Sequence, residues 1–242
     1  MPANDSFHIA VLAGDGIGPE VMAPALEILR KIEATTPGLK FRFSEAPAGA
    51  GHYRDTGKSM PESTVKLCRD ADAILLGACG LPDVRYPDGT EIMPQVELRF
   101  IFDLYAGVRP ARLVPGVPSP IVGADRNGID LVLIRESTEG LFASMGKGVV
   151  THDEARETLV ITRKTSERLF EFSCRLAERR KARGRPGKLT CVDKAKCSKR
   201  TLSSARSSTN APRAIPASRP TGFTWMPVRR CWCAGRGILT SW

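Results

Sequence analysis

The segment that most constrains the fold is the glycine-rich stretch Ala13–Glu20, which reads AGDGIGPE. An apolar run before it, Phe7–Leu12, predicts a buried strand. A helical pattern with an apolar stripe follows from Pro19 to about Glu33. The three glycines allow a sharp turn and keep side chains away from a ligand, and Pro19 suits a first helical turn. Because the spacing differs from Gly-x-Gly-x-x-Gly, the residues alone leave open a plain turn or a nucleotide-binding turn.

Strand and helix patterns alternate along the following residues. The sequence predicts strands at 40–45, 73–76, 104–109, 131–135 and 189–192, and helices at 61–70, 95–102 and 165–183. Residues 48–58 have the Gly and Asp content of a loop, and residues 157–163 alternate. A second glycine-rich loop, Gly77–Pro82, follows a predicted strand. This order predicts an α/β layered fold with a mainly parallel sheet.

The basic charge of the chain is concentrated near its C-terminal end. The formal net charge is +10, but residues 196–242 hold nine Lys or Arg and no Asp or Glu, so residues 1–195 are nearly neutral. All three tryptophans also lie in residues 196–242. Residues 197–221 are rich in Ser, Arg, Thr, Pro and Ala, a composition typical of disorder. We therefore expect an α/β domain over 1–195 and a non-homologous basic tail over 196–242.

The composition also bears on compartment and partners. Residues 1–6 contain no basic apolar leader, and no apolar run has the length of a membrane span. Seven cysteines without the spacing of a metal site are typical of a reducing cytosol. We expect a cytoplasmic protein with no nucleic-acid or membrane partner. The alternative is a nucleic-acid-binding protein that uses residues 196–242 on phosphate groups, with the α/β part as a scaffold.

Three arginines at predicted strand or helix ends are candidates for binding carboxylates. Arg99 and Arg109 lie ten residues apart in LRFIFDLYAGVRPARL (98–113), and Arg135 lies in LIRESTEGLF (133–142). Arginine binds a carboxylate through two parallel hydrogen bonds. Taken singly, an arginine of this kind is better explained as a solvated surface charge, so the surrounding segments decide its interpretation.

These segments resemble the isocitrate/3-isopropylmalate/tartrate dehydrogenase family. The string GDGIGPE, the two arginine segments, the loop Gly77–Pro82 and the string CVDKA (191–195) occur in the family's order across residues 7–195. The resemblance implies an enzyme that oxidises a malate-like dicarboxylate 2-hydroxy acid with NAD or NADP and Mg²⁺ or Mn²⁺, often with decarboxylation. It also implies an isopropylmalate dehydrogenase-like fold, truncated in this chain, and a homodimer.

The resemblance assigns roles to individual residues. It implies substrate binding by Arg99, Arg109, Arg135 and Gln95, cofactor binding by Ile17, Gly77, Ala78, Cys79, Gly80 and Pro82, and catalysis by Lys194 across the dimer interface. Phe142 occupies the position of the family's tyrosine and has no proton to donate to the carbon left by decarboxylation. The amide of Gln95 fits an isopropyl group poorly, so a polar-substituted malate or tartrate is an equal expectation for the substrate.

The family's metal-binding aspartates follow its lysine motif, whereas residues 196–242 hold no acidic residue. A divalent cation requires oxygen ligands, so we predict no metal ligand in this chain and no activity. The coding DNA can be re-read so that each codon begins at the third base of the codon for the printed residue. In this frame Trp225-Met226 becomes Asp-Ala, and Cys231–Cys233 becomes Leu-Val. These pairs resemble the family's later segment, so we expect residues 196–242 to be that segment in a wrong reading frame.

Overall fold

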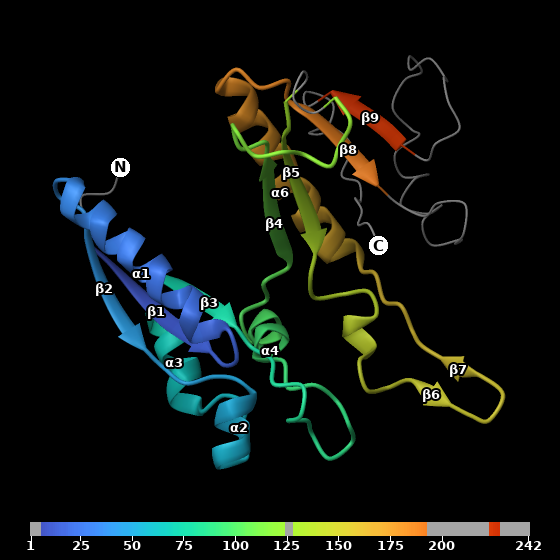
Figure 1. Cartoon of the computed structure of the whole chain (residues 1–242). Helices are drawn as coiled ribbons and strands as arrows, with labels where there is room; N and C mark the ends of the chain where they lie inside the picture. The colour runs from blue at the N-terminus through green and yellow to red at the C-terminus, as the bar shows by residue number, and fades with distance from the viewer. Residues whose placement is uncertain (1–5, 124–127, 193–222, 228–242) are drawn as a thin grey trace. The chain divides into compact units, whose positions relative to one another are not determined.

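A computed structural model of the chain describes residues 6–123, 128–192 and 223–227 (Figure 1). It divides into two compact units, Met1–Phe102 and Asp103–Trp242. The sequence predicts one domain over 1–195, and each hydrophobic cluster formed by the described residues lies within one of these units. Hydrophobic periodicity predicts individual strands and helices, but it does not show which of them share a hydrophobic core. The division of the chain into two units therefore could not be predicted from the sequence.

The first unit is a three-stranded parallel sheet with helices on both faces (Figure 1). Its elements are β1 (Ser6–Gly14), α1 (Gly18–Thr35), β2 (Lys40–Glu45), α2 (Ala50–Thr56), α3 (Glu62–Asp70), β3 (Ala73–Ala78) and α4 (Pro94–Ile101). The strand order is β2-β1-β3, so the chain moves to one side of β1 and then returns to the other. Open α/β sheets bind ligands at such a reversal, beyond the carboxyl ends of the strands.

The central strand β1 is buried on both faces. Ile9 and Val11 belong to a cluster with residues of α1. Ala10 and Leu12 belong to a cluster with residues of α3 and α4. Because alternate side chains of a strand point to opposite faces, burial on both sides explains why the four consecutive residues Ile9–Leu12 are all apolar. This covered strand fixes where the glycine-rich turn after it lies.

The described residues of the second unit form two-stranded antiparallel ribbons, a short 3-10 helix and one long helix. Its elements are β4 (Ala106–Arg112), β5 (Asp130–Glu136), η1 (Phe142–Ser144), β6 (Val149–Val150), β7 (Ala155–Arg156), α6 (Arg163–Ala182), β8 (Lys188–Val192) and β9 (Phe223–Pro227). The strands pair as β4-β5, β6-β7 and β8-β9. Thr162 caps α6, since its side-chain oxygen accepts a hydrogen bond from the N–H of Thr165 at 3.2 Å.

The predicted α/β class and parallel sheet are confirmed in the first unit. The prediction of parallel pairing is wrong for β4 and β5, which are antiparallel. A parallel return requires a crossover, and the described part of the connection between these strands contains no helix. The alternating residues 157–163 form no strand: they contain the isolated bridge between Val160 and Gly140, and Arg163 begins α6. The strand β9 lies in a segment for which the sequence predicts no element.

The prediction of a loop over residues 48–58 is also wrong, since these residues contain α2. Gly49 precedes the helix with φ +124°, and Gly57 ends it in the left-handed conformation with φ +76°. Glycine is favoured in both conformations, so the residues that indicate a loop are in fact the boundaries of a short helix. Within the described residues, no helix has the length and apolar character needed to cross a bilayer.

Candidate functional site

The two glycine-rich loops lie side by side at the carboxyl ends of β1 and β3, where Gly14 is opposite Ala78. A Cβ atom at Gly18 would lie 2.4 Å from the carbonyl oxygen of Ala78. A Cβ atom at Gly77 would lie 2.2 Å from the carbonyl oxygen of Ala13. Such distances are far below van der Waals contact, so the close approach of the two backbones requires glycine at both positions.

The outer side of this sheet edge is open. Gly80 and Pro82 are exposed, and Ile17 at the start of α1 is 59% exposed. A Cβ atom at Gly80 would have no neighbouring heavy atom within 4 Å. Ala78 and Cys79 are half-buried beneath them. The residues predicted to bind the cofactor thus lie at one edge of one unit, with room for a ligand over Gly80.

Cys79 is a neutral thiol within this loop. Burial, reinforced by the charge of Asp15, raises the pKa of Cys79 to about 11. The thiolate is the reactive form, so we expect alkylation of Cys79 to be slow at neutral pH and to rise as the pH approaches 11. Peptide-resolved alkylation against pH measures this directly. A midpoint near that of a free thiol, about 8.5, would contradict the expected environment.

Gln95 and Arg99 lie one turn apart on α4, so their side chains occupy the same side of the helix. Both are half-buried, whereas Val96 and Leu98 between them are buried in the core. The Oε1 atom of Gln95 is buried and accepts no hydrogen bond from the described residues. A buried acceptor without a partner carries a free-energy cost, which makes this oxygen a candidate to accept from a ligand.

The helix α4 is held in place by Glu97, which lies between these two residues. The Oγ atom of Ser59 donates to both carboxylate oxygens of Glu97 at 2.8 Å, and the hydroxyl of Tyr86 donates to Oε1 at 3.3 Å. Burial raises the pKa of Tyr86, so its hydroxyl keeps the proton that it donates. Tyr86 also packs edge-on against Tyr53, with ring centres 4.9 Å apart. This network fixes the orientation of the helix that carries two predicted substrate residues.

In the second unit, Arg109 and Arg135 project from the same face of the β4-β5 ribbon. The register places Arg109 opposite Leu133 and Arg135 opposite Gly107. Directly opposite residues share a face, so the two arginines are diagonal neighbours. The guanidinium carbon of Arg135 lies 5.9 Å from the centre of the Phe142 ring. The unit therefore places two of the predicted substrate arginines on one face and places one of them, Arg135, beside Phe142.

The remaining predicted residues are distributed differently. Arg99 belongs to the first unit and Lys194 lies outside the described residues, so the convergence of all three arginines stays a prediction. In residues 6–123, 128–192 and 223–227, no group of three His, Cys, Asp or Glu is placed to hold a metal ion. Asp15 is a residue of the sheet edge to which the sequence pattern assigns no role, although it stands between two glycines of the motif.

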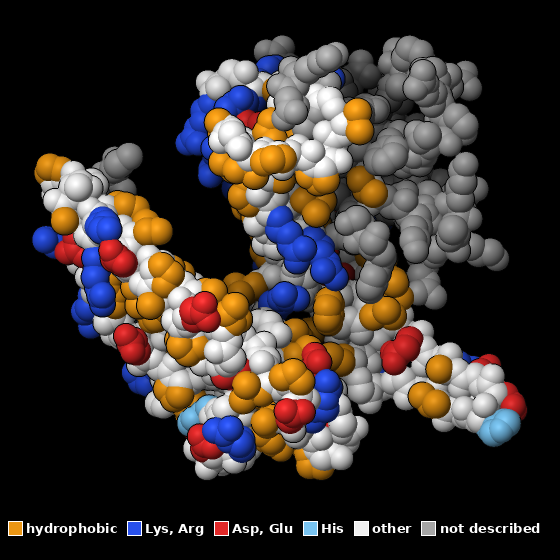
Figure 2. Space-filling view, viewed as in Figure 1, with side chains coloured by type: hydrophobic (Ala, Val, Ile, Leu, Met, Phe, Trp, Pro, Cys, Tyr) orange, Lys and Arg blue, Asp and Glu red, His pale blue; other side chains and the backbone are white. Residues whose placement is uncertain are grey.

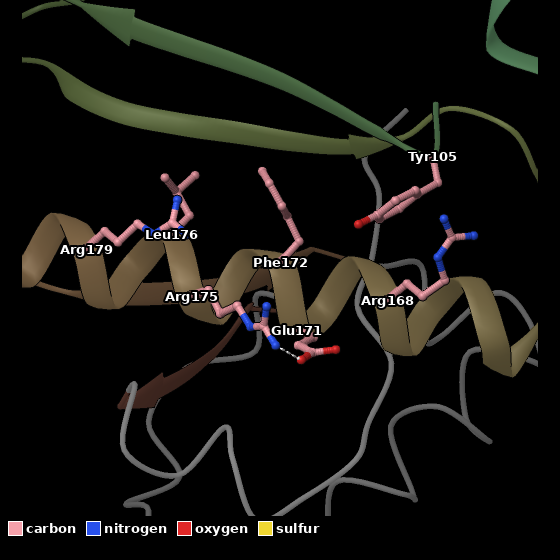
Figure 3. Close-up of a pocket in the computed structure, with 7 residues that line it drawn as sticks. All are labelled: Tyr105, Arg168, Glu171, Phe172, Arg175, Leu176 and Arg179. Carbon is pink, nitrogen blue, oxygen red and sulfur yellow. Dashed lines mark hydrogen bonds and ion pairs between the residues drawn. The ribbon is translucent and has the colours of Figure 1, made fainter. Parts of the chain in front are cut away.

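A pocket of about 220 Å³ lies along α6 in the second unit (Figure 3). It is lined by Tyr105, Arg168, Glu171, Phe172, Arg175, Leu176 and Arg179. The Nη1 atom of Arg168 donates to Asp103 at 2.7 Å, and its guanidinium carbon lies 4.0 Å from the ring centre of Tyr105. Arg175 is paired with Glu171. The lining includes none of the predicted site residues, and three of its four charged residues take part in these ion pairs.

The family described as isocitrate/isopropylmalate dehydrogenase matches residues 8–207. The chain belongs to this family. The match begins within β1, includes both glycine-rich loops and both arginine segments, and extends past Ala195. It therefore confirms the predicted family, and it includes the first residues of the segment that the sequence sets apart as non-homologous.

Named relatives agree with this membership. The 3-isopropylmalate/3-methylmalate dehydrogenase of Methanocaldococcus jannaschii is 40% identical over 197 residues, covering 80% of this chain and 52% of that protein. The 3-isopropylmalate dehydrogenase of Frankia casuarinae is 41% identical over 182 residues, covering 73% of this chain and 50% of that protein. The chain thus spans about half the length of the curated relatives it matches.

Solved structures of related enzymes share the fold. The isocitrate dehydrogenase of Methylococcus capsulatus is 28% identical, with a TM-score of 0.58, covering 72% of this chain and 48% of that one. A beta-decarboxylating dehydrogenase of Thermococcus kodakarensis is 32% identical, with a TM-score of 0.52. The match covers 72% of this chain and 46% of that one. The predicted α/β class and the predicted membership of the isocitrate/isopropylmalate dehydrogenase family are confirmed.

Proposed function

We propose that this chain carries the cofactor loop and the substrate arginines of an enzyme that oxidises a malate-like 2-hydroxy acid with NAD or NADP. The observation that carries the proposal is the shared face of Arg109 and Arg135 on the β4-β5 ribbon. Diagonal neighbours across an antiparallel pair are about 7–8 Å apart at the backbone. Two guanidinium groups at this spacing can each bind one carboxylate of a dicarboxylic acid.

The side chain at Gln95 favours a substrate with a polar substituent. Its buried Oε1 atom lacks a hydrogen-bond donor among the described residues. A hydroxyl group on the substrate would supply that donor, and an isopropyl group would leave the oxygen unpaired. We therefore propose a polar-substituted malate or tartrate as the better substrate. Arg99, one turn further along α4, is proposed as a third carboxylate ligand by the family resemblance.

The cofactor is proposed to lie against the open edge at Gly77–Pro82 and Ile17. This edge suits an extended dinucleotide because its glycines leave little side-chain bulk and because Gly80 is open to solvent. When bound, the nicotinamide supplies the redox step by accepting a hydride from the substrate. The chain's contribution at this edge is to hold the dinucleotide in one orientation.

The divalent metal implied by the family resemblance does not fit the residues of this chain. Residues 196–242 contain no acidic residue, and the described residues hold no suitable ligand cluster. Phe142 packs beside Arg135 and offers no proton for a decarboxylation step. Lys194 is proposed to move the hydroxyl proton, as the resemblance implies. The chemistry proposed from this chain is therefore substrate binding, cofactor binding and proton movement.

We also propose that the active form is a cytoplasmic homodimer. The hairpin β6-β7 and its flanks carry apolar side chains in solvent (Figure 2). Val150 is 81% exposed, Val149 57% and Ile161 58%. Apolar side chains left in solvent can be buried by contact with another protein. A second copy of the chain is the partner that the family resemblance implies.

The proposed function is tested by a nicotinamide absorbance assay on the protein with its reading frame restored after Ala195. We expect reduction of NAD or NADP with Mg²⁺ and at least one of isocitrate, 3-isopropylmalate, malate or tartrate, and higher kcat/KM for acids with polar substituents. Lactate is the control, because it has one carboxylate and cannot engage both Arg109 and Arg135. Absence of turnover with every dicarboxylate would refute the proposal.

A further inference from the structure

One carboxylate in the first unit holds three separate segments together. Asp15 lies in the turn between β1 and α1, and its N–H donates to the carbonyl oxygen of Ala78 at 3.0 Å. Its Oδ1 atom accepts a hydrogen bond from the N–H of Gly80 at 2.6 Å. Its Oδ2 atom accepts one from the N–H of Gly51, in the first turn of α2, at 2.9 Å. The turn after β1, the loop after β3 and the start of α2 therefore share one anchor.

The surrounding glycines make room for this anchor. A Cβ atom at Gly49 would lie 2.1 Å from Oδ2 of Asp15. A Cβ atom at Gly14 would lie 1.9 Å from the carbonyl oxygen of Ala78, and one at Gly16 would lie 2.9 Å from that of Gly80. Gly14 and Gly16 also have positive φ, +82° and +60°. The backbone around Asp15 is thus shaped so that the carboxylate reaches both N–H groups.

Gly80, one of the two residues that Asp15 binds, lies at the open side of the sheet edge. The N–H of Gly80 points to Asp15, whereas the position of its missing side chain is open to solvent. Both bonds of the carboxylate are to backbone amides, so they fix main-chain position and are independent of side-chain identity in the loop. Hydrogen bonds to an ionised acceptor are shorter and stronger than neutral ones. The carboxylate of Asp15 therefore fixes the backbone of the loop at Gly80.

We propose that Asp15 is the positioning residue for the cofactor loop, setting the place of Gly80 and with it the affinity for the dinucleotide. This inference rests on the proposed cofactor role of residues 77–82. Asparagine cannot substitute, because it offers one acceptor oxygen and an NH₂ group that would face a backbone N–H. Glutamate retains two acceptor oxygens on a longer stem.

The first experiment follows amide hydrogen exchange in the full chain with the substitution Asp15→Asn. We expect exchange at Gly80 and Gly51 to become about 10- to 100-fold faster, the range of a lost hydrogen bond to a charged group. Asp72→Asn is the matched control, since Oδ2 of Asp72 accepts from the N–H of His8 at 2.8 Å at the other end of β1. The control should leave exchange at Gly80 unchanged. Unchanged exchange at Gly80 in Asp15→Asn overturns the anchor.

The second experiment measures kinetics in the protein with the restored reading frame. Asp15→Asn should raise KM for the dinucleotide about 10- to 100-fold and leave KM for the hydroxy acid unchanged, whereas a general loss of stability would affect both. Faster exchange at Gly80 with an unchanged dinucleotide KM overturns the positioning role. If the parent protein binds no dinucleotide, the proposed function fails and the inference with it, while exchange still tests the anchor. If Asp15→Asn does not fold, Asp15→Glu is used instead. We expect Asp15→Glu to give smaller increases in the exchange rate at Gly80 and in KM for the dinucleotide. Wild-type values of both quantities in Asp15→Glu would overturn the proposal.

Discussion

Replacement of Arg135 with alanine is expected to weaken substrate binding by about 2–5 kcal/mol in the protein with the complete site. Arg135 is half-buried beside the Phe142 ring, where a carboxylate left without its partner is poorly solvated. The loss combines the missing bidentate pair with the cost of that unpaired charge. The measurement is the dissociation constant of the hydroxy acid, determined by calorimetry in the presence of the dinucleotide.

Arg112→Ala is the matched control for Arg135→Ala, because Arg112 also lies on the β4-β5 ribbon. Arg112 is three residues from Arg109 and therefore on the opposite face, opposite Asp130. Its pair with Asp130, at 3.6 Å, is a surface ion pair with an exposed arginine side chain, worth at most about 1 kcal/mol. We expect its removal to leave substrate binding unchanged. Equal losses of binding free energy in Arg135→Ala and Arg112→Ala would mean that the ribbon face with Arg109 and Arg135 has no specific role in substrate binding.

The cofactor edge is the part of the site that the sequence predicts best. An apolar run buried on both faces, followed by glycines and a helix start, specifies a strand, a turn and a helix by local rules. Two such turns meet whenever their strands are parallel neighbours, as β1 and β3 are. The glycines in both loops already indicate close backbone contact, and the structure shows which carbonyl oxygens they approach.

Features that depend on pairing partners are not encoded in local pattern. The antiparallel direction of β4 and β5 follows from the connection between them, and the apolar alternation of each strand is the same in either direction. The same holds for Asp15, whose role depends on Gly80 and Gly51, residues 65 and 36 positions away in sequence. Long-range contacts of this kind require the three-dimensional arrangement.

Restoring one base after the codon of Ala195 is expected to convert an inactive polypeptide into a metal-dependent dehydrogenase. The polypeptide as printed should show no NAD reduction with malate-type acids and Mg²⁺, because its residues do not fit a metal ion. It should also aggregate as its concentration rises, since the β4-β5 ribbon exposes Val108, Leu131 and Leu133. Stable, cooperative unfolding together with metal-dependent turnover of the printed chain would refute this expectation.

The genetic code supplies the evidence for a shifted frame. Trp and Met have single codons, so reading from the third base makes Trp225-Met226 into Asp-Ala, preceded by Val, Leu or Met. The same shift makes Cys231–Cys233 into Leu-Val, and synonymous codons allow Phe-Asp-Val before Trp242. This order resembles the family's later segment, whose first aspartate is a metal ligand. We propose that residues 196–242 stand in place of that segment, which accounts for their basic charge and clustered tryptophans.

Sequencing the coding DNA tests this proposal before any protein is made. The alternate frame should remain open past Trp242 and encode further aspartates and a glycine-rich nucleotide loop. An alternate frame without the Asp-Ala and Leu-Val segment would end the proposal, and an early stop codon in that frame would indicate a decayed gene. The restored protein should then reduce NAD or NADP only with a divalent metal, and chelation should abolish turnover, because the aspartate supplies the oxygen ligand that residues 196–242 lack.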